Sequence, residues 1–127
     1  MVQRVFLYDS PNTKKKFRAV FEDGSHVDFG GAGYSDYTIH KTPSRMRNYV
    51  RRHGGRIPQK TEELNDPKAI QAAMIGVDNS SSERWGKTGL KTPGFWSRWL
   101  LWSVPSMTGA KQLMEKKFDL KITRKKG

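Results

Sequence analysis

Apolar side chains recur at every second position in two stretches near the start of the chain. The segments 16–21 and 26–29 follow this pattern, and Asp23-Gly24 lies between them. A period of two is typical of strands that bury one face, and an Asp-Gly pair supplies two positive-φ positions for a tight turn. The pattern predicts a β-hairpin, preceded by another apolar run over 2–7 that ends in the turn-forming residues 9–12.

Two segments in the middle of the chain begin and end with helix signals. Thr42-Pro43 and Asp66-Pro67 each place a capping residue before a proline, and a glycine follows each segment. Thr and Asp cap helices well, and proline fits the first turn because its missing N–H is not needed there. The signals predict helices over about 43–53 and 67–75.

Residues 92–105 are rich in tryptophan, and we call them the tryptophan segment. The segment begins at Thr92-Pro93, ends at Pro105 and holds three of the four tryptophans of the chain. These signals predict a helix that is apolar on nearly all sides. A small domain rarely covers every side of a helix, so we expect most of the large side chains in the core and one edge in contact with another protein. The predicted core or interface anchors are Phe95, Trp96, Trp99 and Trp102.

The end of the chain combines a last helix with a strand. Ser106 or Thr108 opens the helix, and apolar residues recur at helical spacing as far as Phe118. Leu120 and Ile122 then alternate with polar residues, as an edge strand would. The predicted order is three strands, four helices and a returning strand, which indicates a small α+β domain.

The length of 127 residues indicates a single domain. We expect an N-terminal antiparallel hairpin or sheet, three to four short helices, and a C-terminal strand that returns to the sheet. The predicted parts of the domain over 1–127 are a β-rich part at 1–40, a helical part at 41–119 with loops at 54–66 and 77–91, and a strand with a basic tail at 120–127.

The composition is strongly basic and contains no cysteine. Twenty-four Lys and Arg against twelve Asp and Glu give a formal net charge of +12, which indicates an acidic partner. The lack of cysteine excludes disulfides, thiolate metal sites and cysteine nucleophiles. No apolar run is long enough for a membrane helix, and the start has no apolar signal core. We therefore expect a soluble, unprocessed protein without membrane insertion.

The positive charge is concentrated in two regions. Residues 31–60 hold seven Lys and Arg against one Asp, and residues 91–127 hold nine against two acidic residues. Guanidinium groups suit phosphate oxygens, and the arginines of the helix predicted at 43–53 lack acidic neighbours in the sequence; a solvated helix face is the alternative. No motif indicates base-specific DNA readout. The predicted contacts to a polyanion or an acidic partner are Lys41, Arg45, Arg47, Arg51, Arg52, Lys121, Arg124, Lys125 and Lys126.

The candidate catalytic and cofactor residues also fit plain structural roles. The glycine run at 30–33 could cradle a phosphate, but no helix with Lys-Ser or Lys-Thr follows it. The three histidines lack metal-ligand spacing. Asp28, Asp36 and His40 could form an acid–base site if the fold gathers them in one pocket. We expect no catalytic residue, no metal site, no cofactor and no enzyme activity.

Several strings of residues carry a family resemblance. Residues 15–53 and 85–122 resemble a family of small basic proteins of uncharacterised function from large nucleocytoplasmic DNA viruses, of the chlorella-virus and mimivirus kind. The segment 54–84 matches less well and is interpreted as an insertion. The resemblance implies a viral origin and often a virion component, and it transfers no catalytic residue. The matching strings are Lys16-Phe17-Arg18 through Val27-Asp28-Phe29-Gly30, then Gly33-Tyr34-Ser35-Asp36-Tyr37-Thr38-Ile39-His40-Lys41, Tyr49 with Arg52-His53, and Thr92-Pro93-Gly94-Phe95-Trp96-Ser97-Arg98-Trp99-Leu100-Leu101-Trp102.

Together, the basic surfaces and the resemblance suggest a non-enzymatic structural component of a large DNA virus particle. We expect a minor capsid or core-associated protein, located in the virion and, during assembly, in the host-cell cytoplasm. Its expected partners are other virion proteins, capsid proteins above all, and DNA or RNA. The alternative is a sequence-nonspecific DNA- or RNA-binding protein that acts in the infected cell.

Overall fold

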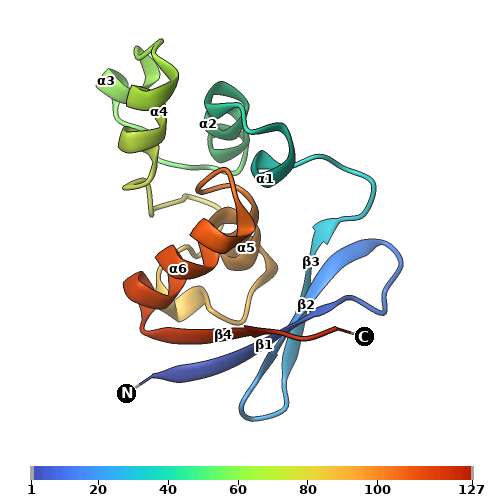
Figure 1. The fold of residues 1–127 in the computed structure, drawn as a ribbon. Coiled ribbons are helices and arrows are strands. Elements are labelled where there is room, and N and C mark those ends of the chain that lie inside the picture. The colour runs from blue at the N-terminus through green and yellow to red at the C-terminus, as the bar shows by residue number, and fades with distance from the viewer. Residues whose placement is uncertain (1, 127) are drawn as a thin grey trace.

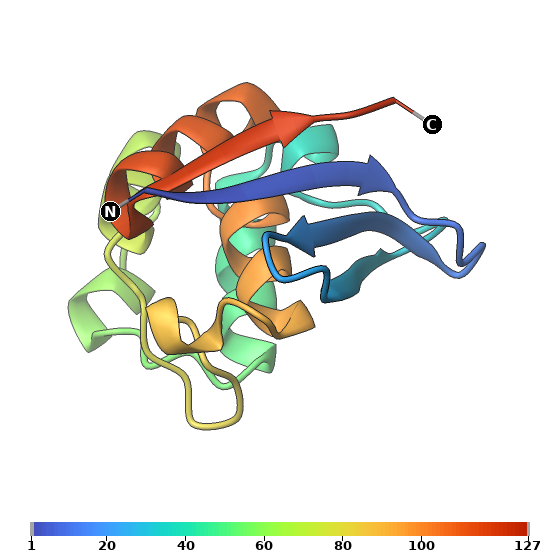
Figure 2. The same ribbon diagram turned by 90° about the horizontal axis from the view of Figure 1, so that it is seen from below.

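A four-stranded sheet forms one side of the molecule (Figures 1 and 2). The computed structural model describes residues 2–126, so Met1 and Gly127 of the predicted domain lie outside the described residues. The strands are β1 (Gln3–Asp9), β2 (Lys15–Phe21), β3 (His26–Gly31) and β4 (Leu120–Arg124). Their order is β3-β2-β1-β4, with β2 antiparallel to both of its neighbours and β4 parallel to β1. The predicted return of the C-terminal strand to the sheet is confirmed.

The helices lie on one side of this sheet in two tiers (Figure 1). The tryptophan segment and α6 pack on the sheet, while α1 to α4 lie beyond them. The predicted α+β single-domain fold is confirmed. The helical elements are α1 (Tyr37–His40), α2 (Pro43–Arg52), α3 (Gln59–Glu62), α4 (Pro67–Met74), the 3-10 turn η1 (Lys87–Gly89), α5 (Pro93–Trp96), the π-helical turn η2 (Ser97–Leu101) and α6 (Met107–Phe118).

The predicted hairpin is present, but its turn differs from the prediction. Ala19 lies opposite Val27 across β2 and β3. Only Gly24 in the turn has a positive φ, of 86°, so the expectation of two such positions is wrong. The side chain of Asp23 instead accepts a hydrogen bond from the backbone N–H of Ser25 at 2.9 Å, which closes a local turn without left-handed backbone at the aspartate.

Capping side chains explain where most helices begin. Asp66, Thr92 and Ser106 accept hydrogen bonds from the backbone N–H three residues later, as the sequence predicts. Thr42 does not cap α2, because its hydroxyl donates to the carbonyl of His40 instead. Asp36 caps α1, a helix that the sequence pattern did not predict.

Three short helical elements lie in segments expected to be β-rich or looped. The turns α1, α3 and η1 have four, four and three residues. Such lengths cannot show a helical repeat of apolar residues, and tertiary contacts stabilise them instead. The tryptophan segment also differs from its prediction, because regular helix ends at Trp96 and a π-helical turn replaces it as far as Leu101.

The core lies between the sheet and the tryptophan segment. Phe95, Trp96 and Trp99 have no exposed surface, whereas Trp102 is partly buried. The ring of Trp96 packs 5.6 Å from that of Phe29 in the sheet, measured between centroids. The indole N–H groups of Trp96 and Trp99 donate to backbone carbonyls at 2.7 and 2.8 Å, so burying these polar atoms leaves none without a partner.

Arg98 is a fully buried cation that connects the two helical tiers. Its guanidinium donates to the carbonyls of Met74 at 2.7 Å and Val77 at 3.0 Å, and also to that of Trp102. It also lies over the ring of Trp99, 4.7 Å from the centroid. Burial lowers the pKa of Arg98 to about 10, which still leaves the side chain protonated at neutral pH. The charge-assisted hydrogen bonds therefore fix the C-terminal end of α4 to the tryptophan segment.

Replacing Arg98 with methionine should destabilise the fold strongly. The change leaves buried carbonyl groups without donors, each at a cost of about 1–3 kcal/mol, so the free energy of unfolding should fall by about 3 kcal/mol or more. Urea denaturation measures this value. Arg56→Met is the control, because the side chain of Arg56 is exposed. A loss for Arg98→Met no larger than that of the control would contradict the anchoring role.

Candidate functional site

A cleft of about 500 Å³ opens between the ends of β2 and β3, helix α2 and the tryptophan segment. Basic side chains line two of its walls, and aromatic rings line its floor. The residues that matter for its chemistry are Lys15, Lys16, Gly30, Gly31, Tyr34, Asp36, Arg45, Tyr49, Arg52, His53, Glu83 and Trp102.

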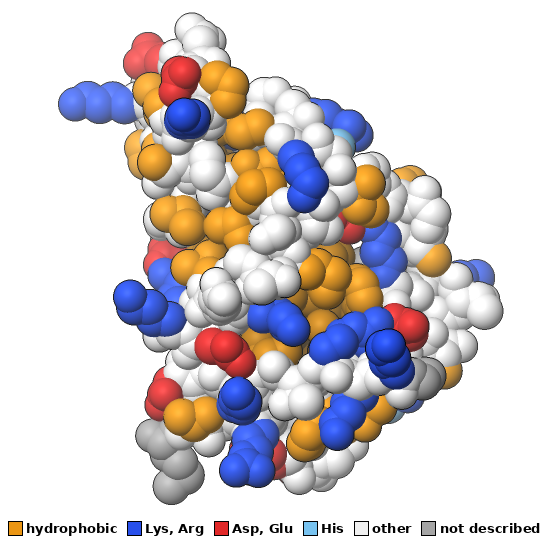
Figure 3. Space-filling view, in the orientation of Figure 1, with side chains coloured by type: hydrophobic (Ala, Val, Ile, Leu, Met, Phe, Trp, Pro, Cys, Tyr) orange, Lys and Arg blue, Asp and Glu red, His pale blue; other side chains and the backbone are white. Residues whose placement is uncertain are grey.

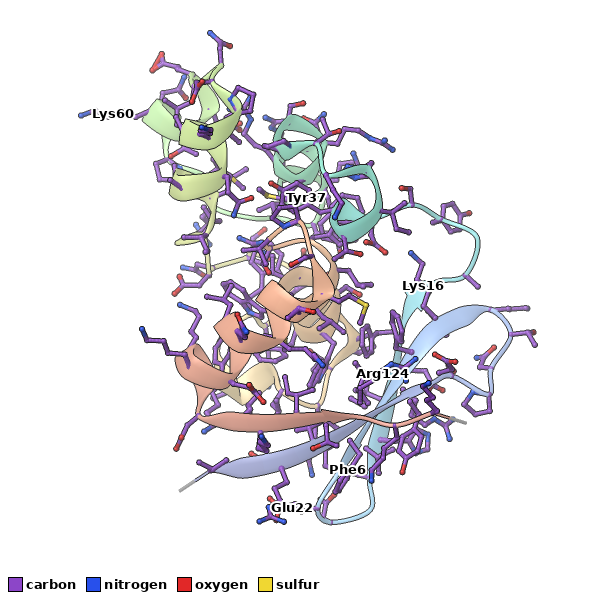
Figure 4. All side chains as sticks on the ribbon, in the orientation of Figure 1. Phe6, Lys16, Glu22, Tyr37, Lys60 and Arg124 are labelled. Atoms are coloured by element: carbon purple, nitrogen blue, oxygen red, sulfur yellow. The ribbon has the colours of Figure 1, made fainter. Side chains whose placement is uncertain are left out.

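Three of the cleft's cations have no acidic partner. Lys15, Arg45 and Arg52 make no ion pair or side-chain hydrogen bond with any residue of the described range 2–126. Arg45 and Arg52 are seven residues apart on α2, which places them on the same side of the helix two turns apart. Lys16 contributes a fourth cation from β2, and Figure 4 shows it on the helix-facing side of the sheet. The strand and the helix thus bring positive charge to the cleft from two directions.

The carboxylates of the cleft are already engaged. Asp36 is 3% exposed, accepts a hydrogen bond from the ammonium of Lys16 at 2.6 Å and caps α1 through the N–H of Thr38 at 2.9 Å. Glu83 binds Nδ1 of His53 at 3.0 Å and the indole N–H of Trp85 at 2.9 Å. Neither carboxylate binds Arg45 or Arg52, so both guanidiniums keep their hydrogen-bonding capacity.

Three stacked rings form the floor. The ring of Tyr49 lies 4.2 Å from that of Trp102, at an interplanar angle of 3°, and 4.0 Å from that of His53, at 27°. Both faces of the tyrosine are therefore covered, and burial raises the pKa of its hydroxyl. The stack fixes α2 against the tryptophan segment and holds the cleft walls in place.

Glycine lets the end of β3 approach the tryptophan segment. Gly30 has φ 78°, and a Cβ atom at this position would lie 2.9 Å from Cδ1 of Leu101. Only glycine fits both constraints without strain. The glycine run does not lead directly into a helix, since α1 begins at Tyr37. Two of its glycines nevertheless line the cleft, a position that the sequence pattern did not reveal.

The other two arginines of α2 lie on a different face. Arg47 donates to the carbonyls of Thr61 at 2.8 Å and Leu64 at 2.9 Å, and Arg51 forms an ion pair with Glu62. Arg51 therefore has an acidic partner, and so does Arg47, whose Nε lies 3.9 Å from Oε1 of Glu62, although neither arginine has an acidic neighbour in the sequence. The acidic partner comes from α3, outside the segment whose charges indicated the surplus.

The remaining predicted cations do not line the cleft. Lys41 donates to the carbonyl of Pro105, and Arg124 forms an ion pair with Asp9. The ammonium of Lys125 lies over the ring of Phe6, 5.4 Å from its centroid, on the side of the sheet that faces away from the helices (Figure 4). Lys121 and Lys126 are exposed. The basic tail is therefore a surface separate from the cleft.

The three residues of the predicted acid–base site do not converge. Asp28 accepts two hydrogen bonds from Arg18, at 2.8 and 3.0 Å, and only Asp36 lines the cleft. His40 accepts a hydrogen bond from the backbone N–H of Thr42 through Nδ1, and burial lowers the pKa of its imidazole. Each side chain serves a local structural contact, so the proposed triad is not a site.

Two other classes of site have no candidate within residues 2–126. No group of three His, Asp or Glu residues in this range could hold a metal ion. No helix in it is long and apolar enough to cross a membrane.

The sequence pattern also missed Lys15, Lys16, Tyr34 and Glu83 as residues of the cleft. Lys15 and Lys16 belong to a run of three lysines that begins at Lys14. This run could have indicated a basic surface at the start of the second strand. Tyr34 and Glu83 gave none, because a single tyrosine and a single glutamate in loops do not indicate a common site before the fold is known.

Replacing Glu62 with glutamine should weaken the contact between α2 and α3. Exposed ion pairs contribute about 0.2–1 kcal/mol, so the free energy of unfolding at pH 7 should fall by less than about 1 kcal/mol. The hydrogen bond from Arg51 lowers the pKa of Glu62, so its stabilising effect is present above the unfolded-state pKa and is lost as pH falls through the folded-state value. The difference in the free energy of unfolding between wild type and variant, measured by urea denaturation, should therefore disappear as the pH falls below about 4.

Glu63→Gln is the matched control, because Glu63 is exposed and its side chain makes no contact of this kind within residues 2–126. Equal losses for the two variants, or a difference that persists at low pH, would show that Glu62 does not act through this ion pair.

Comparison with known proteins gives one partial match. Residues 5–53 match the model of a family of unknown function (DUF5754). No curated protein and no solved structure matches the chain. The matched residues run from β1 to the end of α2 and include both basic walls of the cleft, whereas Glu83 and Trp102 lie outside them. The match covers less than half of the chain and names no activity.

Proposed function

We propose that this protein binds nucleic acid through the cleft, without reading base sequence. The observation that carries the proposal is the convergence of Arg45, Arg52 and Lys15 on one cleft with no acidic partner among residues 2–126. Side chains of this kind stabilise a fold little, because like charges repel each other. An anionic ligand provides the missing counter-charge.

Phosphate groups fit these cations chemically. A guanidinium presents a planar set of N–H donors that matches two phosphate oxygens, and a lysine ammonium supplies a compact charge. Cations on two walls suit a chain of phosphates better than one isolated anion, since each wall contacts a different phosphate. The binding that follows is electrostatic and depends on salt rather than on base sequence.

The wider surface supports a polyanionic ligand. Lys and Arg side chains are more frequent than Asp and Glu on the face seen in Figure 3, and the whole chain carries a net charge of +12. Such a surface attracts nucleic acid over distances of the order of the Debye length, about 8–10 Å at moderate salt. The cleft then supplies the positions where the phosphates are held.

A role in a virus particle remains a separate prediction. It rests on the family resemblance and on the basic tail formed by Lys121, Lys125 and Lys126, which is free to contact capsid protein or packaged DNA. In that case the protein should be present at fixed stoichiometry in purified, washed particles, as mass spectrometry would measure. Its absence from such particles would leave nucleic-acid binding in the infected cell as the function.

The double variant Arg45→Gln/Arg52→Gln should bind a single-stranded oligonucleotide of about 20 nucleotides at least tenfold more weakly than wild type at low salt. The slope of log affinity against log salt concentration should also become shallower by about 1.4, since each lost phosphate contact on a single strand removes about 0.7. Fluorescence anisotropy across a salt series measures both quantities.

Lys60→Gln/Lys116→Gln is the matched control. It removes the same charge from two exposed lysines of α3 and α6 that do not line the cleft. The cleft variant must lose more affinity and more salt dependence than this control. Equal losses would mean that net charge, and not the cleft, determines binding.

A further inference from the structure

We infer that the cleft accepts a single strand of nucleic acid and that Tyr34 stacks on one of its bases. This inference rests on the proposed function and names the class of nucleic acid that the cleft takes. It follows from the position and exposure of one aromatic side chain at the cleft wall.

Tyr34 is the most exposed large hydrophobic residue of the described range, with 77% of its surface accessible. Exposing an aromatic ring to water is unfavourable, and soluble proteins usually bury most of a tyrosine. The exposed ring lies in the wall of a basic cleft and not on a remote loop. A planar ligand that covers the ring would remove this cost.

The backbone holds the ring in a defined place. A Cβ atom at Gly31 would lie 2.8 Å from Cδ2 of Tyr34, so part of the ring rests directly on the glycine. The backbone N–H of Tyr34 donates to the carbonyl of Gly31 at 3.2 Å, and Gly33 takes φ 85° between them. This tight turn leaves the rest of the tyrosine facing solvent. The ring is therefore presented by the backbone rather than extended on a free loop.

The other rings of the cleft offer less free surface for stacking, since Tyr49 is buried, Trp102 is partly buried and the His53 side chain is 38% exposed. Trp102 and His53 cover the two faces of Tyr49, so no base can insert there. Trp102 is itself partly buried, between Tyr49 and the ring of His40, whose centroid lies 5.4 Å away. Tyr34 is the most exposed aromatic side chain of the cleft lining.

Phosphate and base sites adjoin each other in this arrangement. Lys15, opposite Gly31 in the β2–β3 register, stands next to the glycine that supports the tyrosine ring. One nucleotide can therefore place its phosphate on the lysine and its base on the ring. In a duplex the bases are stacked and paired with one another, so only a single strand offers a base to an exposed ring. The same combination of cations and stacking rings is how proteins bind single strands without sequence preference.

Tyr34→Ala should lower affinity for a single-stranded oligonucleotide by about tenfold, because one stacking contact is lost. It should leave unchanged the affinity for an abasic oligonucleotide of the same length, which has the same phosphates and no bases. Tyr34→Phe keeps the ring and should bind like wild type. Ile39→Ala is the control, since Ile39 is 62% exposed and does not line the cleft. Fluorescence anisotropy with both oligonucleotides and with a duplex measures these affinities.

The possible results separate this inference from the proposed function. Equal losses of Tyr34→Ala on the normal and abasic oligonucleotides, or no loss on either, would overturn base stacking. Wild-type binding to the duplex as tight as to the single strand would also overturn it, as would equally effective competition by polyglutamate. If Arg45→Gln/Arg52→Gln binds every nucleic acid like wild type, the proposed function itself fails.

Discussion

The arrangement of the helical tiers depends on a buried guanidinium whose hydrogen bonds all go to backbone carbonyls of the described residues 2–126. Arg98 holds the carbonyls at the end of α4 and the carbonyl of Trp102 at the same time, so the two tiers meet around one cation. The position of Trp102 then determines that of Tyr49, which stacks on it within 4.2 Å. Because Tyr49 belongs to α2, the stack connects this helix to the same cation, in addition to the contacts of α2 with α4. A structural cation in the core is thus connected through these contacts to Arg45 and Arg52, the cations that we propose bind the ligand.

The four arginines of helix α2 lie on two different faces of the helix and make different contacts. Arg45 and Arg52 face the cleft, while Arg47 and Arg51 face α3 and bind Glu62 and nearby carbonyls. The first pair has a spacing of seven residues and the second a spacing of four, so each pair shares a face of the helix. Four arginines that look equivalent in the sequence therefore differ in function: two stabilise the contact with α3, and two remain free for a ligand.

Local pattern was sufficient to predict the strands, the long helices and the fold class. Two local features carried these predictions: the period of two in β2 and β3, and the capping residues of α4, α5 and α6. Both involve only a few neighbouring residues, so they can be recognised in the sequence. The cleft was predicted only in part, through Arg45 and Arg52, because Lys15 and Tyr34 join it through the β2–β3 pairing and the turn after β3. The same distance in sequence hid Glu62 as the partner of Arg51. Contacts of this kind depend on tertiary structure, so no pattern of neighbouring residues in the sequence indicates them.

The two carboxylates of the cleft also support an anionic ligand, because both already have hydrogen-bond partners within the cleft walls. A site for a cation or an amine would need at least one carboxylate that is aimed into the cleft and is not already held by a side chain of the wall. Asp36 is almost completely buried, accepts from Lys16 and caps α1, and Glu83 holds His53 and Trp85. Both carboxylates thus stabilise the walls and are not free to bind a ligand. The cleft instead presents three cations that have no acidic partner among residues 2–126, beside the exposed ring of Tyr34, and this arrangement supports the proposed binding of a phosphate chain that carries bases.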